Sequence, residues 1–403
     1  MSRAEDVVIT GLGVVSAAGL NLPATLACFA SGRRSPGKVT LFATTLANPV
    51  FEVRGLPGDD TGTERTLRLT AHALQEALAE AGLAGPLAGR RVGVAMGTTV
   101  ASQLNDLPFY TAYRQTKSAP MEAVQRFLKG NLADAVAQSV GAVGPCATVV
   151  NACSSSADAI GMACSWLRAG ACDLALAGGG DELNRVPYCG FNALSVFSPE
   201  PCAPYDRDRK GLNLGEGAAV LVLERRSAAL ARGVPPVLTV AGYGLACDAY
   251  HMTAPRPDGT GLEAAIRRAL DEAGIAAEAV AFVNAHGTAT RDNDRVEGAV
   301  LARVFGPGVR VLSTKGYTGH TLGAAGALEA AFTAAGLREG WIPASAGFVN
   351  RDDEIPIGAV RERTAVDGRY ALSTSLAFGG NNAALVIGYE GAPHGPLHAG
   401  GAA

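Results

Sequence analysis

The chain has 403 residues, a formal net charge of −3 and 48% hydrophobic residues. A chain of this length buries more than one simple pair of layers, so we expect two domains or one duplicated architecture. The small negative charge argues against a broad nucleic-acid or anionic-membrane surface. We therefore expect neither nucleic acid nor a membrane among the partners.

The cysteine usage indicates a reduced environment. None of the eight cysteines forms a CxxC pair, and the polar start is unlike a signal peptide, so a cytoplasmic protein is expected. Seven of the cysteines are predicted to be small buried hydrophobes: Cys28, Cys146, Cys164, Cys172, Cys189, Cys202 and Cys247. Residues 321–337 are nearly free of charge, but Glu329 interrupts them, which favours a helix buried within protein over a membrane span.

Short apolar stretches alternate with alanine-rich stretches of helical period. Strands are predicted at residues 7–10, 92–96, 148–150, 174–177, 218–224, 237–244, 281–284, 311–313, 370–375 and 384–389. Helices are predicted at residues 65–81, 154–168, 261–273, 294–304 and 323–338. Continuous apolar strands between helices indicate an α/β fold whose sheet is covered on both faces.

The same order of motifs occurs twice along the chain. "VVITGLGVVSAAG" opens the first series and "VLTVAGYGLACDAYH" the second; "TVVNACSSSADAIGMA" and "VLSTKGYTGHTLGAAGALEA" then take matching places. This repetition predicts two similar halves, residues 1–235 and 236–390, joined by the Gly-Val-Pro-Pro segment at 233–236. Residues 391–403 are small, polar and rich in Pro and Gly, and are predicted to be a disordered tail.

Cys153 lies where a strand is predicted to turn into a helix. The unpaired N–H groups and the positive end of the helix dipole favour a thiolate there, which would make this sulfur a nucleophile. The residues Ser154–Ser156 are suited to capping the helix. An inert buried cysteine before a helix remains the alternative.

Two of the six histidines lie in Gly/Thr-rich loops at strand ends. His286 follows an apolar strand in "FVNAHGTATRDND", and His320 precedes a helix in "STKGYTGHTLGAAG". Together with Cys153 they favour a catalytic site over separate core residues. A Cys/His/His zinc site is the alternative, but no second cysteine or closely spaced ligand pair supports it, so no metal is expected.

Six longer motifs resemble the β-ketoacyl synthases, the condensing enzymes of fatty-acid and polyketide assembly. They are "NACSSS", "CAPYDRDRKGLNLGEGAAVLVLE", "DAYHMTAPRPDG", "NAHGTATRDND", "STKGYTGHTLGAAGALE" and "LAFGGNNAALVI". They follow the order of that family and extend over about residues 5–390. The resemblance implies a thiolase-like fold, with duplicated halves in five α-β-α-β-α layers and the site between the halves.

The resemblance also implies a reaction. Cys153 would accept an acyl group from an acyl carrier protein, and His286 and His320 would donate hydrogen bonds to the malonyl thioester while carbon dioxide leaves. Backbone N–H groups of Cys153 and Phe378 would hold the oxyanion, and Gly379 and Gly380 would let the backbone approach the substrate. No cofactor is expected, because the phosphopantetheine arm arrives on the carrier protein.

Further roles follow from the same resemblance. A buried Lys315–Glu329 pair would support the second histidine, and Asp294 and Glu297 would anchor the His286 loop. Three other residues would contact the substrate: Thr288 and Thr290 as hydroxyl partners of the phosphopantetheine arm, and Phe378 as a gate between the malonyl and acyl pockets.

Four positions depart from the common pattern of the family. Asn151 and Asn381 stand where relatives often have Thr, and Leu212 and Leu376 where elongation synthases often carry Phe. Together with "ACSSS" they favour a specialised polyketide or polyene pathway over bulk fatty-acid synthesis. They leave the acyl-chain preference open.

Two other classes of protein share this pattern in part. A chain-length-factor-like subunit would lack the nucleophile, whereas Cys153 is present. A thiolase acting on coenzyme A esters uses a second, late cysteine, and none follows Cys247. A homodimer and a heterodimer with a chain-length-factor-like paralogue are both expected possibilities.

Overall fold

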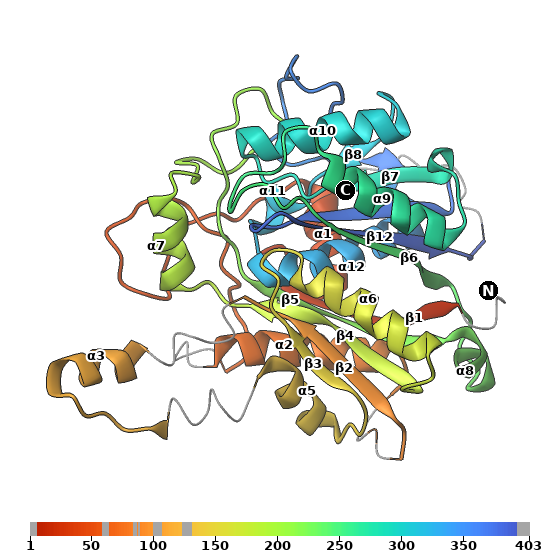
Figure 1. Cartoon of the computed structure of the whole chain (residues 1–403), viewed down its shortest axis with the longest axis horizontal. Helices are drawn as coiled ribbons and strands as arrows, with labels where there is room; N and C mark the ends of the chain where they lie inside the picture. Colours follow the sequence, from red (N-terminus) through yellow and green to blue (C-terminus); the bar gives the residue numbers. More distant parts are fainter. Residues whose placement is uncertain are drawn as a thin grey trace.

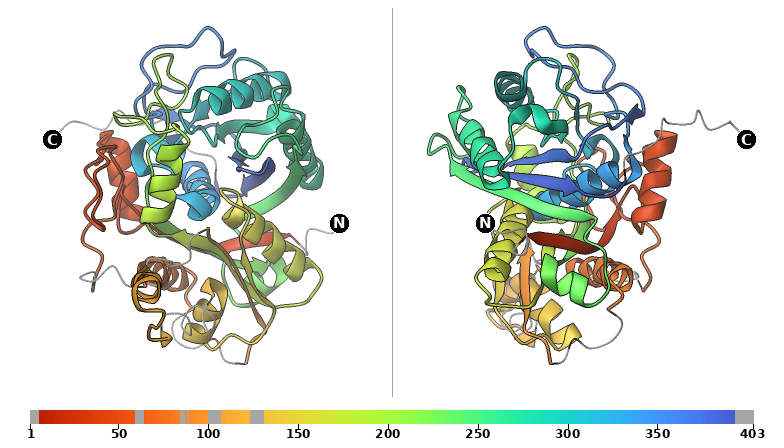
Figure 2. Two further views of the ribbon diagram at one scale, coloured as in Figure 1. Left: turned by 60° about the vertical axis from the view of Figure 1, so that its left-hand side comes forward. Right: turned by 90° about the vertical axis from the view of Figure 1, so that its right-hand side faces the viewer.

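The computed structural model describes residues 6–58, 64–83, 87, 89–99, 107–122 and 131–392. Most of the tail predicted to be disordered, residues 393–403, lies outside this part of the chain. Figures 1 and 2 show a layered α/β molecule in which helices cover the strands on both sides.

Ten strands of the described chain form one hydrogen-bonded sheet in the order β3-β2-β4-β5-β1-β6-β12-β11-β7-β8. The strands of the first half are β1 (Val7–Ser16), β2 (Val92–Gly97), β3 (Cys146–Val149), β4 (Leu174–Asp181) and β5 (Gly217–Arg225). Those of the second half are β6 (Leu238–Cys247), β7 (Val280–Asn284), β8 (Val311–Leu312), β11 (Tyr370–Leu376) and β12 (Asn381–Tyr389). Read outward from the β1–β6 junction, the two halves present matching strands in matching order.

The junction between the halves is short. β1 pairs with β5 along its whole length, but with β6 only over Val7–Ile9. The two five-stranded portions therefore separate beyond this point, and the space between them is filled by α6 (Ser155–Arg168) and α12 (Ala325–Glu339) (Figure 1). Residues 325–337 of α12 are buried all round, which confirms the prediction of a charge-poor helix enclosed by protein.

Three apolar cores hold these layers together. The central core joins α6 and α12 to the inner faces of both groups of strands. A second core lies under α2 (Arg65–Glu80) and α5 (Leu132–Val140), and a third lies under α9 (Thr260–Ala273) and α10 (Arg291–Phe305). The resulting α-β-α-β-α order is the five-layer arrangement that the family resemblance implies.

The predicted strands and long helices are all present, with ends shifted by a few residues. The sequence analysis missed the short elements: α1 (Leu22–Ser31), α3 (Leu107–Thr116), α5, α7 (Arg185–Ala193), α8 (Arg226–Ala231), α11 (Lys315–Thr318), β9 (Trp341–Ile342) and β10 (Thr364–Ala365). Elements this short carry little periodicity, and tertiary contacts decide their conformation.

The prediction of seven buried cysteines is wrong for four of them. Cys146, Cys189 and Cys247 are exposed and Cys28 is half-buried, whereas the other three are buried. None of the helices in the described part of the chain combines the length and apolarity that a bilayer span requires.

The close contact of the two central helices predicts a stability effect. A methyl group at Gly326 would lie 2.8 Å from the backbone nitrogen and Cβ of Ala157 on α6. Gly326→Ala should therefore lower the free energy of unfolding by about 1–3 kcal/mol, as overpacked cores do. Denaturant unfolding measures this change.

The control is Gly190→Ala on α7, where nothing lies within 4 Å of the added methyl group. That substitution should be neutral or stabilise by about 0.5–1 kcal/mol. Equal stability of the Gly326→Ala variant and the parent would contradict close packing of α6 against α12.

Candidate active site

Cys153 lies in the turn between β3 and α6. Ala152 before it has a φ of 49°, a left-handed conformation that is uncommon for residues other than glycine. The N–H of Asn151 donates to the Ser155 hydroxyl (2.8 Å), which in turn donates to the carbonyl of Ala152 (2.6 Å). This turn directs the sulfur inward, and Cys153 is only 4% exposed.

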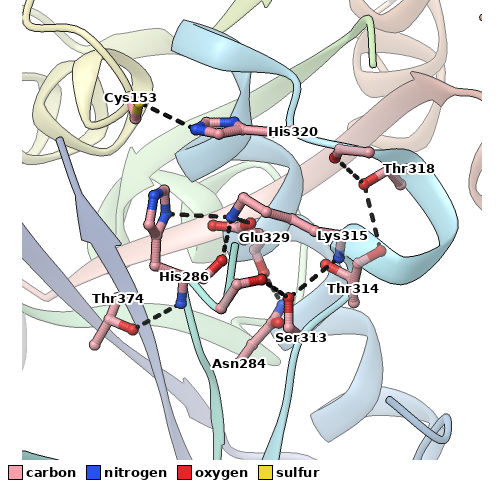
Figure 3. Close-up of polar contacts among 12 residues, drawn as sticks. Cys153, Asn284, His286, Ser313, Thr314, Lys315, Thr318, His320, Glu329 and Thr374 are labelled. Atoms are coloured by element: carbon pink, nitrogen blue, oxygen red, sulfur yellow. Dashed lines mark hydrogen bonds and ion pairs between the residues drawn. The ribbon is translucent and has the colours of Figure 1, made fainter. Parts of the chain in front are cut away.

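His320 lies in the loop between α11 and α12 and contacts the sulfur directly. Its Nε2 is 3.1 Å from Cys153 Sγ (Figure 3). Its Nδ1 accepts the N–H of Leu322 (3.2 Å). Because Nδ1 is an acceptor, the proton of the neutral ring resides on Nε2 and points towards the sulfur.

His286 follows β7 and lies beside His320, with ring centroids 5.2 Å apart. Its Nδ1 accepts from the ammonium of Lys315 (3.2 Å), so its proton also resides on Nε2. Ligand-type atoms of Cys153, His286 and His320 all lie within 4.8 Å of one another. The structure thus brings together, from both halves, the three residues singled out in the sequence.

Lys315 is the buried cation of the site. Its Nζ donates to the carbonyl of His286 (2.6 Å) as well as to Nδ1 of that ring, and it forms an ion pair with Glu329 of α12 (Figure 3). All three ammonium protons therefore have acceptors. Burial raises the pKa of Glu329 to about 7, although Lys315 opposes this shift.

Burial and the Lys315 charge both lower the pKa of His286 and of His320 well below the usual value. Both rings are consequently neutral at neutral pH. Burial raises the pKa of the Cys153 thiol to about 11, although Lys315 and the N–H of Phe378 oppose this shift. This direction is opposite to the resting thiolate expected at a helix N-terminus, because burial disfavours the charged form of the sulfur.

Glu297 and Asp294 of α10 hold the His286 loop by accepting its backbone N–H groups. Glu297 accepts from the N–H groups of His286 and Gly287 (both 2.8 Å). Asp294 accepts from the N–H of Ala289 (3.1 Å). Both carboxylates are buried in the anchoring position that the sequence analysis expected.

A cavity of about 460 Å³ opens onto the three residues. Its wall includes Thr288 and Thr290, whose hydroxyls are 2.9 Å apart, and Phe378, whose ring stacks on Phe191 of α7 at 5.3 Å. Leu212 and Leu376 also line it. Gly379 and Gly380 follow Phe378 with φ of 90° and 82°, which only glycine adopts readily.

Several lining residues were missed. They are Phe191, Leu194, Ser195, Val196, Lys210, Gly211, Asp248, Thr253–Pro255, Arg291–Asn293, Ala377 and Asn382. The motif "DAYHMTAPRPDG" contained Asp248 and Thr253–Pro255, and "GGNN" contained Asn382, so a signal existed for these. The residues of α7 gave no such signal in the sequence, because a nine-residue helix shows too little helical periodicity.

The zinc alternative conflicts with the histidine tautomers. A ring that binds a metal through Nε2 normally donates an N–H from Nδ1. Here Nδ1 of both rings accepts a hydrogen bond, and the ammonium of Lys315 lies beside them. The residues around this cluster therefore do not fit a bound cation.

The buried thiol predicts an unusual alkylation profile. With a pKa of about 11, the rate of Cys153 alkylation by iodoacetamide should rise about tenfold per unit between about pH 6.5 and 9.5, without a plateau. Peptide mass spectrometry of the exposed Cys189 in the same samples is the control. A plateau for Cys153 near neutral pH would show a resting thiolate and contradict this electrostatic account.

Comparisons with known proteins agree on one family. Residues 55–229 match the β-ketoacyl synthase N-terminal domain and residues 237–349 the C-terminal domain. The 3-oxoacyl-[acyl-carrier-protein] synthase 2 of Staphylococcus aureus is 32% identical, over 96% of this chain and 99% of the relative.

Two solved structures are similar throughout. The ishigamide ketosynthase/chain length factor has a TM-score of 0.88 and 32% identity, over 96% of this chain and 99% of that one. A type II polyketide ketosynthase in complex with its acyl-carrier protein has a TM-score of 0.87 and 26% identity, with the same coverage. With its fold, its buried Cys/His/His cluster and these matches, the chain belongs to the β-ketoacyl synthase family.

Proposed function

We propose that the chain is a 3-oxoacyl-[acyl-carrier-protein] synthase, which condenses a malonyl thioester with an acyl group held on Cys153. The observation that carries the proposal is the convergence of one thiol and two Nε2–H donors within 4.8 Å at the end of a cavity. One group can take the acyl chain and two can hold a developing enolate.

The first step is acyl transfer. The sulfur of Cys153 attacks the thioester of the acyl carrier protein, a new thioester bond forms, and the carrier thiolate leaves with the cysteine proton. The pKa of about 11 means that the thiol must lose its proton as the reaction proceeds, so the site does not maintain a free thiolate. The N–H groups of Cys153 and Phe378 would hold the transient oxyanion.

The second step is decarboxylative condensation. His286 and His320 donate to the carbonyl of the malonyl thioester, and the electrons of the breaking C–C bond form an enolate as carbon dioxide leaves. The carbanion attacks the acyl carbonyl, a C–C bond forms, and the sulfur of Cys153 departs and regains a proton. Neutral imidazoles suit this task, because each can donate an N–H hydrogen bond to the enolate oxygen. An imidazolium would be a stronger acid than the enolate requires.

The other residues would act as supports. Lys315 and Glu329 would keep His286 in its donor tautomer, whereas the sequence analysis expected this pair to support the second histidine, His320. Asp294 and Glu297 would hold the His286 loop. Substrate contacts would come from the cavity wall: Thr288 and Thr290 for the phosphopantetheine arm, Phe378 as the gate, and Gly379 and Gly380 for close approach of the backbone. No cofactor and no metal enters this scheme.

A second subunit and an acyl carrier protein are the proposed partners. β3 is an edge strand, and Val143 and Val150 near its ends are 70% and 67% exposed. The helix α3 projects from the body with Tyr110 58% exposed (Figure 1). Such surfaces favour a dimer with an identical or chain-length-factor-like chain. Solved relatives include a ketosynthase/chain length factor and a carrier-protein complex.

We also propose that the halves divide near residue 235. The matching strand orders on either side of the β1–β6 junction support this boundary. The match to the N-terminal family domain ends at residue 229 and the match to the C-terminal domain begins at residue 237, which also supports this boundary.

Two alternatives are less well supported. A non-catalytic chain-length factor would not need the intact Cys153, His286 and His320 cluster. A thiolase would need a second reactive cysteine beside Cys153, and in the described part of the chain only His residues share its cluster. The departures at Leu212 and Leu376, both at the cavity, favour a specialised polyketide or polyene chain.

Intact-mass analysis tests the proposal. The protein, exposed to a panel of acyl carrier proteins, should gain one acyl mass, and Cys153→Ala should gain none because the nucleophile is lost. Cys164→Ala, which replaces a buried cysteine on α6, the helix that follows the nucleophile, is the matched control and should acylate normally. Addition of malonyl carrier protein should then release a 3-oxoacyl product.

A second arm isolates the histidines. His320→Ala should lower malonyl decarboxylation by about 10²–10³, the usual cost of one lost donor. His72→Ala should not, because this residue of α2 does not line the cavity. Acylation of the Cys153→Ala protein, or normal decarboxylation by His320→Ala, would contradict the proposed mechanism.

A further inference from the structure

A buried carboxylate beside the nucleophile is not used by the mechanism above. Asp158 lies on α6, 7% exposed, five residues after Cys153. Its Oδ2 accepts the side-chain amide N–H groups of Asn151 (2.6 Å) and Asn381 (3.1 Å) and lies 2.9 Å from the Ser154 hydroxyl. Its Oδ1 accepts from the Tyr243 hydroxyl (2.8 Å).

These donors come from separate parts of the molecule. Asn151 and Ser154 belong to the nucleophile turn of the first half, whereas Tyr243 lies on β6 and Asn381 begins β12 in the second half. Asn381 also donates to the Ser154 hydroxyl (2.6 Å). Asn151 and Asn381, the two departures from Thr noted in the sequence, thus meet at one carboxylate.

On one side, the contact with Asp158 restrains Cys153. The side chain of Asn151 is held by Asp158, and only Ala152, with its φ of 49°, separates Asn151 from the nucleophile. A non-glycine residue in that conformation is retained only where its neighbours are fixed. Loss of the Asn151 contact would let this turn relax and rotate the N–H of Cys153.

On the other side, the contact restrains Phe378. The carbonyl of Asn381 accepts the N–H of Ala377 (2.8 Å), and Gly380 closes the turn with an N–H to the carbonyl of Ala377 (3.0 Å). The next N–H along the chain is that of Phe378, which lines the same cavity as Cys153 and lowers the pKa of its thiol. Asp158 therefore binds both Asn151, which supports the N–H of Cys153, and Asn381, which supports the N–H of Phe378. These are the two N–H groups assigned to the oxyanion.

We propose that Asp158 is a positioning residue that sets the spacing of the Cys153 and Phe378 N–H groups through Asn151 and Asn381. This inference rests on the proposed function. It predicts an effect on the two steps that create an oxyanion, acyl transfer and C–C bond formation. Malonyl decarboxylation, which depends on His286 and His320, should be spared.

The test uses Asp158→Asn, which keeps the shape but replaces one acceptor oxygen by a donor. We expect kcat for condensation to fall by about tenfold or more, but by less than the 10²–10³ that complete loss of an oxyanion donor costs. KM for the malonyl carrier protein should be nearly unchanged. Malonyl decarboxylation, compared between Cys153→Gln and Cys153→Gln/Asp158→Asn, should differ by less than about threefold, since neither histidine contacts Asp158.

Two further variants separate positioning from simple destabilisation. Tyr243→Phe removes a hydrogen bond to Asp158 from a residue that supports neither the Cys153 nor the Phe378 N–H group. The condensation rate should therefore stay within about threefold of the parent. Asp158→Asn/Asn381→Asp exchanges acceptor and donor and should recover part of the lost rate. Thermal unfolding should show that all variants remain folded.

Each outcome has a distinct meaning. Failure of the unmodified protein to form a 3-oxoacyl product contradicts the proposed function and this inference with it. If the unmodified protein condenses but Asp158→Asn does so equally fast, or loses decarboxylation in equal measure, the positioning role is wrong while the proposed function stands. Equal loss in Tyr243→Phe and Asp158→Asn also contradicts it.

Discussion

The contact between the Lys315 ammonium and Nδ1 of His286 is the constraint on which the rest of the site depends. A buried cation is costly unless each of its protons has an acceptor. Here the acceptors are the ring nitrogen and carbonyl of His286 and the carboxylate of Glu329. Burial, and after it the same charge, lowers the pKa of both histidines, so that they remain neutral N–H donors.

The duplicated fold makes this arrangement possible. The two groups of strands meet only over Val7–Ile9, and α6 and α12 fill the space between them. The nucleophile therefore comes from one half and both histidines from the other, and all three side chains are buried. Burial also raises the pKa of Cys153, so the resting group in this enclosed site is a thiol and not a thiolate.

The sequence was informative where a pattern is long or chemically distinctive. Strand and helix order, the duplication and the Cys153, His286 and His320 cluster could all be predicted, because strand ends and histidine-bearing loops are marked by composition. The thiol pKa could not, since desolvation depends on complete tertiary packing. The contacts of Asp158 also could not, because its donors lie up to 223 residues away.

The most direct test of the account is the tautomer of the two histidines. Side-chain ¹⁵N NMR of the histidine-labelled protein, with His286→Gln and His320→Gln for assignment, reports which ring nitrogen carries the proton. The account predicts neutral Nε2–H rings for both at pH 7. An imidazolium at either position at pH 7, or a proton on Nδ1, would contradict it.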